Sequence, residues 1–333
     1  MVCEATISKA SYNLIGVGTL LSSFLLLIIN GVQRVLGKRL IREWPLHLMI
    51  FPSVIFLFIY SYIPMFGITI AFEKFIPSKG ILHSPKVGWK NFQFFLEYPD
   101  LQRVLFNTIS IALMKMAAGL IVPLIVSLLL NEIRKVLFKR VFQTLVYLPH
   151  FLSWVLLGGI LIDILSPSTG IVAKALGMLG IEPIYFLGDN RWFPFVIVIS
   201  DVWKEFGFST IVYLAALTSI NPSLYEAASM DGAGRWKQTW HITLPGMLPV
   251  IILLATLSLG NVLNAGFDQI FNLYSPQVYE SGDIIDTLVY RLGMEQFQYG
   301  VSTAIGLIKS LVSLVFISLS YFLAYRLANY RIF

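Results

Sequence analysis

Charged and amide side chains interrupt several long apolar runs of this sequence, where they could bind a polar ligand. Asn261, Asn264 and Asp268 follow i, i+3, i+7 spacing, so a helix over this run would place them on one face. Amide and carboxylate groups hydrogen-bond hydroxyl groups, and aromatic rings can cover the faces of sugars. The candidate residues for a polar path are Lys115, Asn261, Asn264, Asp268, Gln269 and Lys309, with rings from Tyr147, Trp154, Trp203, Phe267 and Phe271.

Each of these residues also has a purely structural interpretation. Lys115 and Lys309 could be partners for acids on neighbouring helices, or cations beside the path of a polyanion. Asp201, Lys204 and Glu205 could pair with one another at i, i+3 and i, i+4 spacing. His150 could be a packed residue, and most aromatic residues core or interface anchors. Both interpretations stay open at this stage.

A polar segment of small and aromatic residues, "LYEAASMDGAGRWKQTWHITLP" (224–245), lies between two long apolar runs. Asn221 is a good helix N-cap, and Pro222 suits the first helical position. Gly232 is a suitable C-terminal stop. The sequence therefore predicts a short helix over 222–232.

The composition indicates a membrane protein. Of the 333 residues, 57% are hydrophobic and 13% charged, and a soluble domain would carry roughly twice that charged fraction. Several apolar runs are long enough to cross a bilayer as a helix. We expect an all-α polytopic fold with spans at about 46–70, 104–130, 141–164, 193–218, 245–271 and 302–326.

Basic residues indicate how these spans are oriented. They cluster before the first span, in the loop between the second and third spans, in the segment 224–245 and at the C-terminus, and such clusters favour the cytoplasmic side. The run 12–30 is a further span with the N-terminus outside, or else a signal-like segment. We therefore expect an N-terminal segment 1–45 and a membrane domain 46–333, with the C-terminus cytoplasmic. This placement assigns the net charge of +6 to topology, and we expect no nucleic-acid partner.

The spacing Glu226-Ala227-Ala228, three residues, Gly232, nine residues, Ile242-x-Leu244-Pro245 resembles the EAA signature of binding-protein-dependent ABC importer permeases. The stretches "YIPMFGITIAF" (62–72), "YLPHFLSWV" (147–155), "ISDVWKEFGFSTIVYLAAL" (199–217) and "DTLVYRLG" (286–293) extend the resemblance across nearly the whole chain. They are similar to the maltose-type group, and within it to the subfamily that imports complex oligo- and polysaccharides.

This resemblance implies a six-span type I ABC importer core in the bacterial cytoplasmic (inner) membrane, sometimes with an extra N-terminal span. It implies a coupling helix at 222–232 that docks on a cytoplasmic ATPase through Glu226, Ala227, Ala228, Asp231 and Gly232. It further implies four kinds of partner: a second permease subunit, two ATPase copies, an extracytoplasmic solute-binding protein, and an oligosaccharide or polysaccharide, with acidic sugars such as alginate among the candidates. The sequence lacks the phosphate-cradling motif G-x-x-x-x-G-K-[ST], so ATP–Mg is expected on the partner ATPases and no cofactor in this chain.

Two other classes of protein remain as alternatives. A membrane-embedded glycan enzyme would need acidic catalytic or metal-binding groups at a membrane face, which the sequence does not supply. An ion-coupled secondary transporter would predict inverted repeats with broken helices in matched halves, and would leave the EAA spacing unexplained. The chain has one cysteine, Cys3, and no His-x-x-x-His pair, so we expect neither a disulfide framework nor a metal site.

Overall fold

The computed structural model describes residues 43–133 and 135–328, and the chain divides into two units, Met1–Gly67 and Ile68–Phe333. The expected extra span at 12–30 lies outside the described residues. A helix runs over Glu43–Phe72 and is long and apolar enough to cross a membrane, close to the expected span 46–70. It contains a π turn, η1 (Phe58–Tyr62), and ends in the 3-10 segment η2 (Ile63–Phe72).

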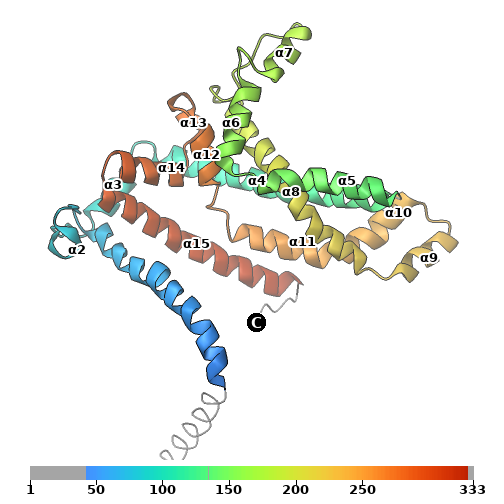
Figure 1. The fold of residues 1–333 in the computed structure, drawn as a ribbon, viewed down its shortest axis with the longest axis horizontal. Coiled ribbons are helices and arrows are strands. Elements are labelled where there is room, and N and C mark those ends of the chain that lie inside the picture. The colour runs from blue at the N-terminus through green and yellow to red at the C-terminus, as the bar shows by residue number, and fades with distance from the viewer. Residues whose placement is uncertain (1–42, 134, 329–333) are drawn as a thin grey trace, which may run out of the picture. The chain divides into compact units, whose positions relative to one another are not determined.

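The second unit is helical, and within the described ranges its β-structure is confined to one isolated bridge between Glu73 and Lys86 (Figure 1). Its elements, in chain order, are α2 (Gly80–His83), α3 (Lys90–Leu96), α4 (Leu101–Glu132), α5 (Val136–Tyr147), η3 (Leu148–Phe151), α6 (Trp154–Leu165), α7 (Ile171–Met178), α8 (Phe193–Thr218), α9 (Pro222–Met230), α10 (Arg235–Gln238), η4 (Thr239–Thr243), α11 (Leu244–Leu259), α12 (Phe267–Leu273), η5 (Pro276–Val278), α13 (Tyr279–Gly282), α14 (Ile285–Tyr290), η6 (Arg291–Glu295) and α15 (Tyr299–Ala328).

Four helices in the described residues have the length and apolar composition of membrane spans. They are Glu43–Phe72, Leu101–Glu132, Arg235–Leu259 and Tyr299–Leu323. A bent pair of helices, Val136–Phe151 and Trp154–Leu165, would be a fifth span if the two halves cross together. Helix α8 has 26 residues, enough to cross, but it carries Asp201, Lys204 and Glu205 within its length. The helices thus match a polytopic fold, while the expected count of six spans depends on the bent pair and on α8.

The expectation of one continuous helix over 141–164 is wrong. The two halves of this segment meet at an angle of 104°. Pro149 has no backbone N–H for a helical hydrogen bond, and Leu152 is extended. Ser153 then begins α6 by accepting a hydrogen bond from the backbone N–H of Leu156 at 3.3 Å. The break is therefore encoded locally, by a proline followed by a helix cap.

The expectation of one helix over 245–271 is also wrong. Helix α11 ends at Leu259, and α12 begins only at Phe267. Gly266, which precedes α12, has φ of +93°, a left-handed conformation that glycine adopts without steric penalty. The predicted single helical face of Asn261, Asn264 and Asp268 therefore does not exist.

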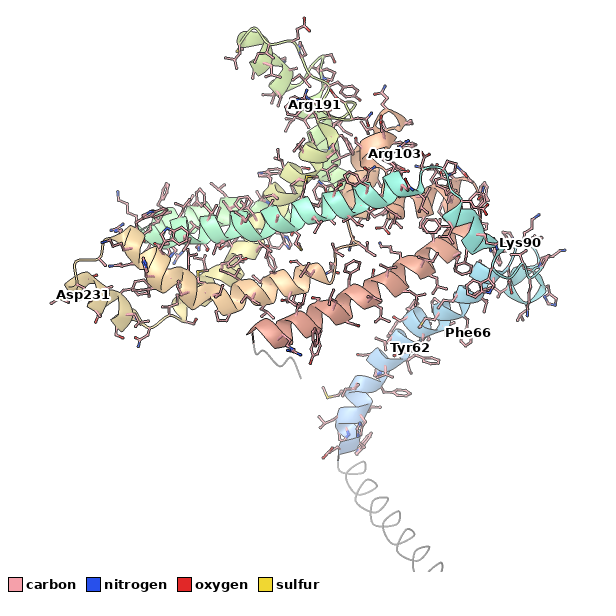
Figure 2. All side chains as sticks on the ribbon, turned by 180° about the vertical axis from the view of Figure 1, so that it is seen from behind. Tyr62, Phe66, Lys90, Arg103, Arg191 and Asp231 are labelled. Carbon is pink, nitrogen blue, oxygen red and sulfur yellow. The ribbon has the colours of Figure 1, made fainter. Side chains whose placement is uncertain are left out.

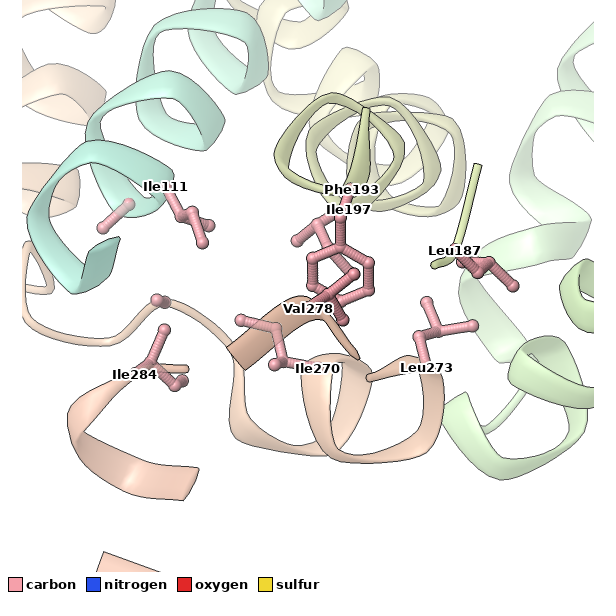
Figure 3. Close-up of a cluster of buried hydrophobic side chains, with 10 residues drawn as sticks. Ile111, Leu187, Phe193, Ile197, Ile270, Leu273, Val278 and Ile284 are labelled. Carbon is pink, nitrogen blue, oxygen red and sulfur yellow. The ribbon is translucent and has the colours of Figure 1, made fainter. Parts of the chain in front are cut away.

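The core of the second unit joins segments that are distant in sequence. Phe193 and Ile197 of α8 point toward Ile270 and Val278, and Ile111 of α4 lies at the other side of this cluster (Figure 3). All five side chains are fully buried. The cluster fastens α12 and the segment after it to α8, close to the break in the span.

The long helices of this unit separate two groups of loops. Helices α9 and α10 lie at one end of α4 and α11, while α3, α13 and α14 lie at the other end (Figure 1). Viewed from behind, Asp231 lies at one extreme, and Arg103 and Lys90 lie toward the opposite one (Figure 2). The segment with the EAA spacing is thus separated by the length of the helices from the segments expected outside.

Candidate functional site: a polar cavity and the exposed helix 222–230

A cavity of about 370 Å³ lies where α4, α8 and the non-helical segment 260–266 meet. Polar side chains from all three elements line it, together with apolar residues. The lining residues are Ala112, Lys115, Met116, Gly119, Asp201, Ser209, Ser258, Asn261, Val262, Asn264 and Gly266. The break after Leu259 is what brings the two asparagines to this cavity together with Lys115.

Lys115 is the central contact of the cavity. Its Nζ donates to Asp201 Oδ1 at 3.1 Å and to the carbonyl oxygen of Ala265 at 2.7 Å. It also donates to the side-chain oxygen of Gln269. The lysine side chain is only 10% exposed, so its charge is held by the carboxylate and the two dipoles rather than by water. Lys115 of α4 therefore holds both α8 and the non-helical segment between α11 and α12.

Gln269 extends this network away from the cavity. It is fully buried, and its Nε2 donates to the carbonyl oxygen of Ile197 at 2.7 Å and to Ser200 Oγ at 2.8 Å. A buried amide with partners for both its oxygen and its nitrogen is a structural group. Gln269, expected on the substrate path, therefore lies behind the cavity and supports it.

A second charged cluster lies beside the bend between α5 and α6. Lys204 Nζ donates to the carbonyl oxygen of His150 at 2.9 Å and to Glu205 Oε1 at 2.7 Å, and His150 Nδ1 lies 2.7 Å from Glu205 Oε2. The His150 ring stacks on Phe208 at 4.3 Å. Gly207 of α8 lets this helix approach α5 closely, because a Cβ at this position would lie 2.1 Å from the carbonyl oxygen of Val146. The expected pairing of Asp201 within α8 does not form, because Asp201 pairs with Lys115 and Lys204 pairs with its direct neighbour Glu205.

The other predicted path residues lie apart from the cavity. Lys309 forms an ion pair with Asp286, and Trp203 lines an apolar hollow with Trp192 and Phe186. Asp268 is exposed and is not part of the cavity lining, and Tyr147 ends α5 with its ring half-buried. Of the proposed path, the structure brings together Lys115, Asn261 and Asn264.

Two lining serines escaped the sequence analysis. Ser209 of α8 and Ser258 of α11 border the cavity with the asparagines. Ser258 lies three residues before Asn261, so a signal was present in the i, i+3 spacing. Ser209 had no comparable signal, because its place depends on the packing of α8 against α4.

A polar network anchors the segments expected outside. Arg291 donates to both carboxylate oxygens of Asp283, at 3.1 and 2.5 Å, and its guanidinium lies 4.6 Å from the ring centre of Tyr279. Burial alone would lower the pKa of Arg291, but the hydrogen bonds and charge of Asp283, with a contribution from Tyr98, raise it. Asn107 of α4 donates to the carbonyl oxygens of Glu280 and Asp283 at 3.0 and 3.2 Å. The segment 279–291 is thus tied to the start of α4.

Aromatic rings continue from the cavity border toward this network. Phe267 stacks on Phe271 at 5.2 Å, Phe271 contacts Tyr290 at 4.6 Å, and Tyr274 lies 5.1 Å from Tyr279. Burial raises the pKa of Tyr274, so its hydroxyl stays neutral. Phe267 and Phe271 remain candidates for contact with a sugar, since both rings are only half-buried.

Helix α9 carries the EAA residues at the opposite end of α4. Asn221 Oδ1 accepts from the backbone N–H of Ser223 at 3.0 Å and begins the helix. At its end, the N–H of Ala233 donates to Ala228 and the N–H of Gly232 to Ser229, at 2.9 and 3.1 Å. This is a Schellman motif, and it requires the positive φ of +76° that Gly232 adopts. The side chains of Glu226, Ala227 and Asp231 are exposed, and Ala228 is partly covered.

Comparison with known proteins decides the family. The profile of the family described as "Binding-protein-dependent transport system inner membrane component" matches residues 119–329, more than half of the chain. The chain belongs to this family. It is therefore a multi-pass inner-membrane permease, and the EAA spacing on α9 lies inside the matched region.

Individual relatives cover nearly the whole chain. "Polygalacturonan/rhamnogalacturonan transport system permease protein YteP" of Bacillus subtilis (strain 168) is 40% identical over 295 residues, covering 89% of this chain and 92% of the relative. "Protein LplB" of the same organism is 42% identical over 275 residues, covering 83% and 86%.

A solved structure is similar in fold. It is described as "Crystal structure of bacterial alginate ABC transporter in complex with alginate pentasaccharide-bound periplasmic protein" and matches with a TM-score of 0.80 and 37% identity, over 88% of this permease and 98% of that chain. The predicted resemblance to carbohydrate ABC permeases is confirmed.

Proposed function

We propose that this permease is the pore-forming subunit of an ATP-driven importer that moves an oligosaccharide or polysaccharide across the cytoplasmic membrane by alternating access. The observation that carries the proposal is the 40% identity, over nearly the full length of both chains, to a permease named for polygalacturonan and rhamnogalacturonan. The family match over residues 119–329 supports the same conclusion.

The cavity supports a carbohydrate as substrate. Asn261, Asn264, Ser209 and Ser258 offer neutral donors and acceptors, which match the hydroxyl groups of a sugar. Lys115 offers no free charge, because its ammonium is bound by Asp201 and two further acceptors. We infer that this subunit recognises hydroxyl groups, and that acidic residues of a substrate are tolerated rather than selected at the cavity.

Acidic glycans remain within the proposed substrate class. Polygalacturonan is named for one relative, and alginate, an acidic polysaccharide, for a solved structure 37% identical to this chain. An acidic glycan would have to be selected elsewhere, for example by the external binding protein or by the second permease subunit. Two different permease chains would then divide the recognition of the sugar between them.

Helix α9 supports the coupling role in this proposal. Its residues Glu226, Ala227 and Asp231 are exposed, and α9 lies at one end of the long helices, away from α3, α13 and α14 at the other end (Figure 1). We infer that this end is cytoplasmic, that the C-terminus lies there too, and that α9 docks on one of two ATPase copies that bind ATP–Mg. An extracytoplasmic binding protein would deliver the sugar at the opposite end.

The test is ATPase activity of the purified complex in lipid, measured with the binding protein and a panel of neutral and uronate oligosaccharides. Stimulation by a loaded binding protein, accompanied by uptake of labelled sugar into proteoliposomes, is the expected result. A complex of intact composition that no sugar stimulates, but that a different class of solute does stimulate, would reject carbohydrate as the substrate.

The docking role of α9 has its own test. In a Cys3→Ser background, Glu226→Cys should form a disulfide or short-reagent crosslink with a cysteine placed on the ATPase surface. A cysteine in place of Gln296, an exposed residue at the opposite end, is the matched control and should not crosslink. Equal crosslinking at both positions would remove the proposed docking role.

A further inference from the structure

Hydrogen bonds from a few side chains join α9 to the helix that follows it. Gln238 Nε2 donates to Ser229 Oγ at 3.0 Å and to the carbonyl oxygen of Ala233 at 2.9 Å. The hydroxyl of Tyr225 lies 3.0 Å from Thr243 Oγ1. The described residues of α9 have no extensive packing contact with another helix, so these bonds determine how α9 is held.

The partners of α9 lie at the base of one continuous helical segment. α10, η4 and α11 together run from Arg235 to Leu259 as a single span. Thr243 closes the π turn η4 and is only 5% exposed, which makes it a firm attachment point for Tyr225. The C-terminal end of this span leads directly into Asn261 and Asn264, which line the cavity. A displacement of α9 that moves Thr243 would therefore reach the cavity along this continuous helical segment.

A third contact joins the same base to α4. Arg235 Nη1 donates to Glu132 Oε2 at 2.6 Å, between the first residue of α10 and the last of α4. Helix α4 carries Lys115, the central contact of the cavity. The pair is about half exposed, so it contributes little to stability, but its short contact fixes the position of one helix end against the other.

Without these bonds the backbone alone would connect α9 to the span. Gly232 and Gly234 lie in that connection, and two glycines in three residues leave it free to bend. A hinge at this position would absorb the displacement of a docked helix. The side-chain bonds bridge over the glycines, from Ser229 and Ala233 to Gln238 and from Tyr225 to Thr243.

We propose that Gln238, Tyr225 and Arg235 are positioning residues that make α9, the base of α11 and the end of α4 move as one body, so that displacement of α9 is transmitted to the polar cavity. This inference rests on the proposed docking of α9 on the ATPase. None of the three residues contacts the substrate cavity; each acts through the helix it holds.

The test measures coupling, as sugar molecules imported per ATP hydrolysed, in the complete reconstituted complex. Gln238→Ala removes two of the bonds and should lower this ratio about tenfold, equivalent to about 1.4 kcal/mol, while ATP hydrolysis continues. Tyr225→Phe deletes only the hydroxyl and should lower the ratio about threefold. Thr239→Val is the matched control: its hydroxyl bonds only to the carbonyl oxygen of Arg235 in the same turn, and the ratio should not change.

The ion pair is tested by exchange of its charges. Glu132→Arg alone should lower the ratio, and the double variant Glu132→Arg with Arg235→Glu should restore it. A residue that only stabilises the fold would lower transport and ATP hydrolysis together, whereas a positioning residue separates the two. The ratio of sugar imported to ATP hydrolysed therefore distinguishes a loss of coupling between α9 and the cavity from a general loss of folding.

Crosslinking separates the failure of this inference from the failure of the docking proposal. If Gln238→Ala and Tyr225→Phe both keep the wild-type ratio while Glu226→Cys still crosslinks to the ATPase, the positioning role is overturned and docking stands. If Glu226→Cys does not crosslink even with Gln238 intact, the docking proposal fails and this inference fails with it. Should Gln238→Ala not assemble, Tyr225→Phe decides the question alone.

Discussion

Replacing Lys115 by methionine should destabilise the protein, because it removes the donor that joins three elements around the cavity. Methionine matches the length and volume of the lysine side chain without its ammonium group. The change leaves the Asp201 carboxylate, the carbonyl oxygen of Ala265 and the side-chain oxygen of Gln269 without their shared donor. The break between α11 and α12 would then lose its tie to α4.

The size of this effect follows from the burial of the partners. Removing one member of a buried ion pair costs about 3–5 kcal/mol. The side chain of Asp201 is 26% exposed toward the cavity, so water can partly replace the lysine, and we expect the lower end, about 3 kcal/mol. With an unfolding entropy of about 2.1 cal/mol/K per residue, a chain of 333 residues loses roughly 1.4 °C of unfolding midpoint per kcal/mol, which predicts a fall of roughly 4 °C.

The assay is thermal unfolding of the purified complex in lipid, followed by tryptophan fluorescence. Asp201→Asn and the double variant complete a double-mutant cycle, and the double variant should recover about half of the loss because no unpaired charge remains. Ser310→Ala, which removes an exposed hydroxyl bonded to its own helix, is the control. A Lys115→Met protein as stable as the unaltered one, or single losses that add fully in the double variant, would refute this account of the cavity.

Three further predictions concern the remaining sites. Gly232→Val places a β-branched residue at φ of +76°, which costs about 1–2 kcal/mol and should fray the end of α9. Binding of the ATPase in a pull-down should therefore fall, whereas Gly234→Ala should leave this binding unchanged. Asn264→Ala should raise the KM for sugar uptake several-fold without loss of complex on size-exclusion chromatography, whereas an equal rise in Asp268→Asn would contradict the observed cavity lining. Arg291→Met leaves Asp283 buried without its partner and should lower the unfolding midpoint by about as much as Lys115→Met, and an unchanged midpoint would show that the outer network is dispensable.

Much of the architecture was predictable because its signals are local. The length of apolar runs predicted helices at 46–70, 104–130 and 302–326, each of which lies within an observed helix. Asn221, Pro222 and Gly232 specify the start and end of a short helix through their own backbone and side-chain preferences. The EAA spacing identified the family through residues that are close in sequence.

The interpretation of Asn261, Asn264 and Asp268 as one helical face failed for a physical reason. The spacing argument assumes that the helix continues, and hydrophobicity does not report where a span breaks. Gly260 and Gly266 permitted the break, but glycine is common in membrane helices, so it was a weak signal. The carbonyl oxygen of Ala265 is left outside any helix, and Lys115, 150 residues earlier, supplies its hydrogen bond.

The sequence by itself thus determined the helical membrane class, the family and the local form of α9, because each depends on residues within a few turns of one another. Only the tertiary structure decided which charges neutralise which. Lys115 bonds Asp201 across 86 residues, and Arg235 bonds Glu132 across 103. Ion pairs between helices depend on how the helices pack, because the two partners are distant in sequence and meet only in the folded chain. The identity of the cavity and its link to α9 are therefore properties of the packing.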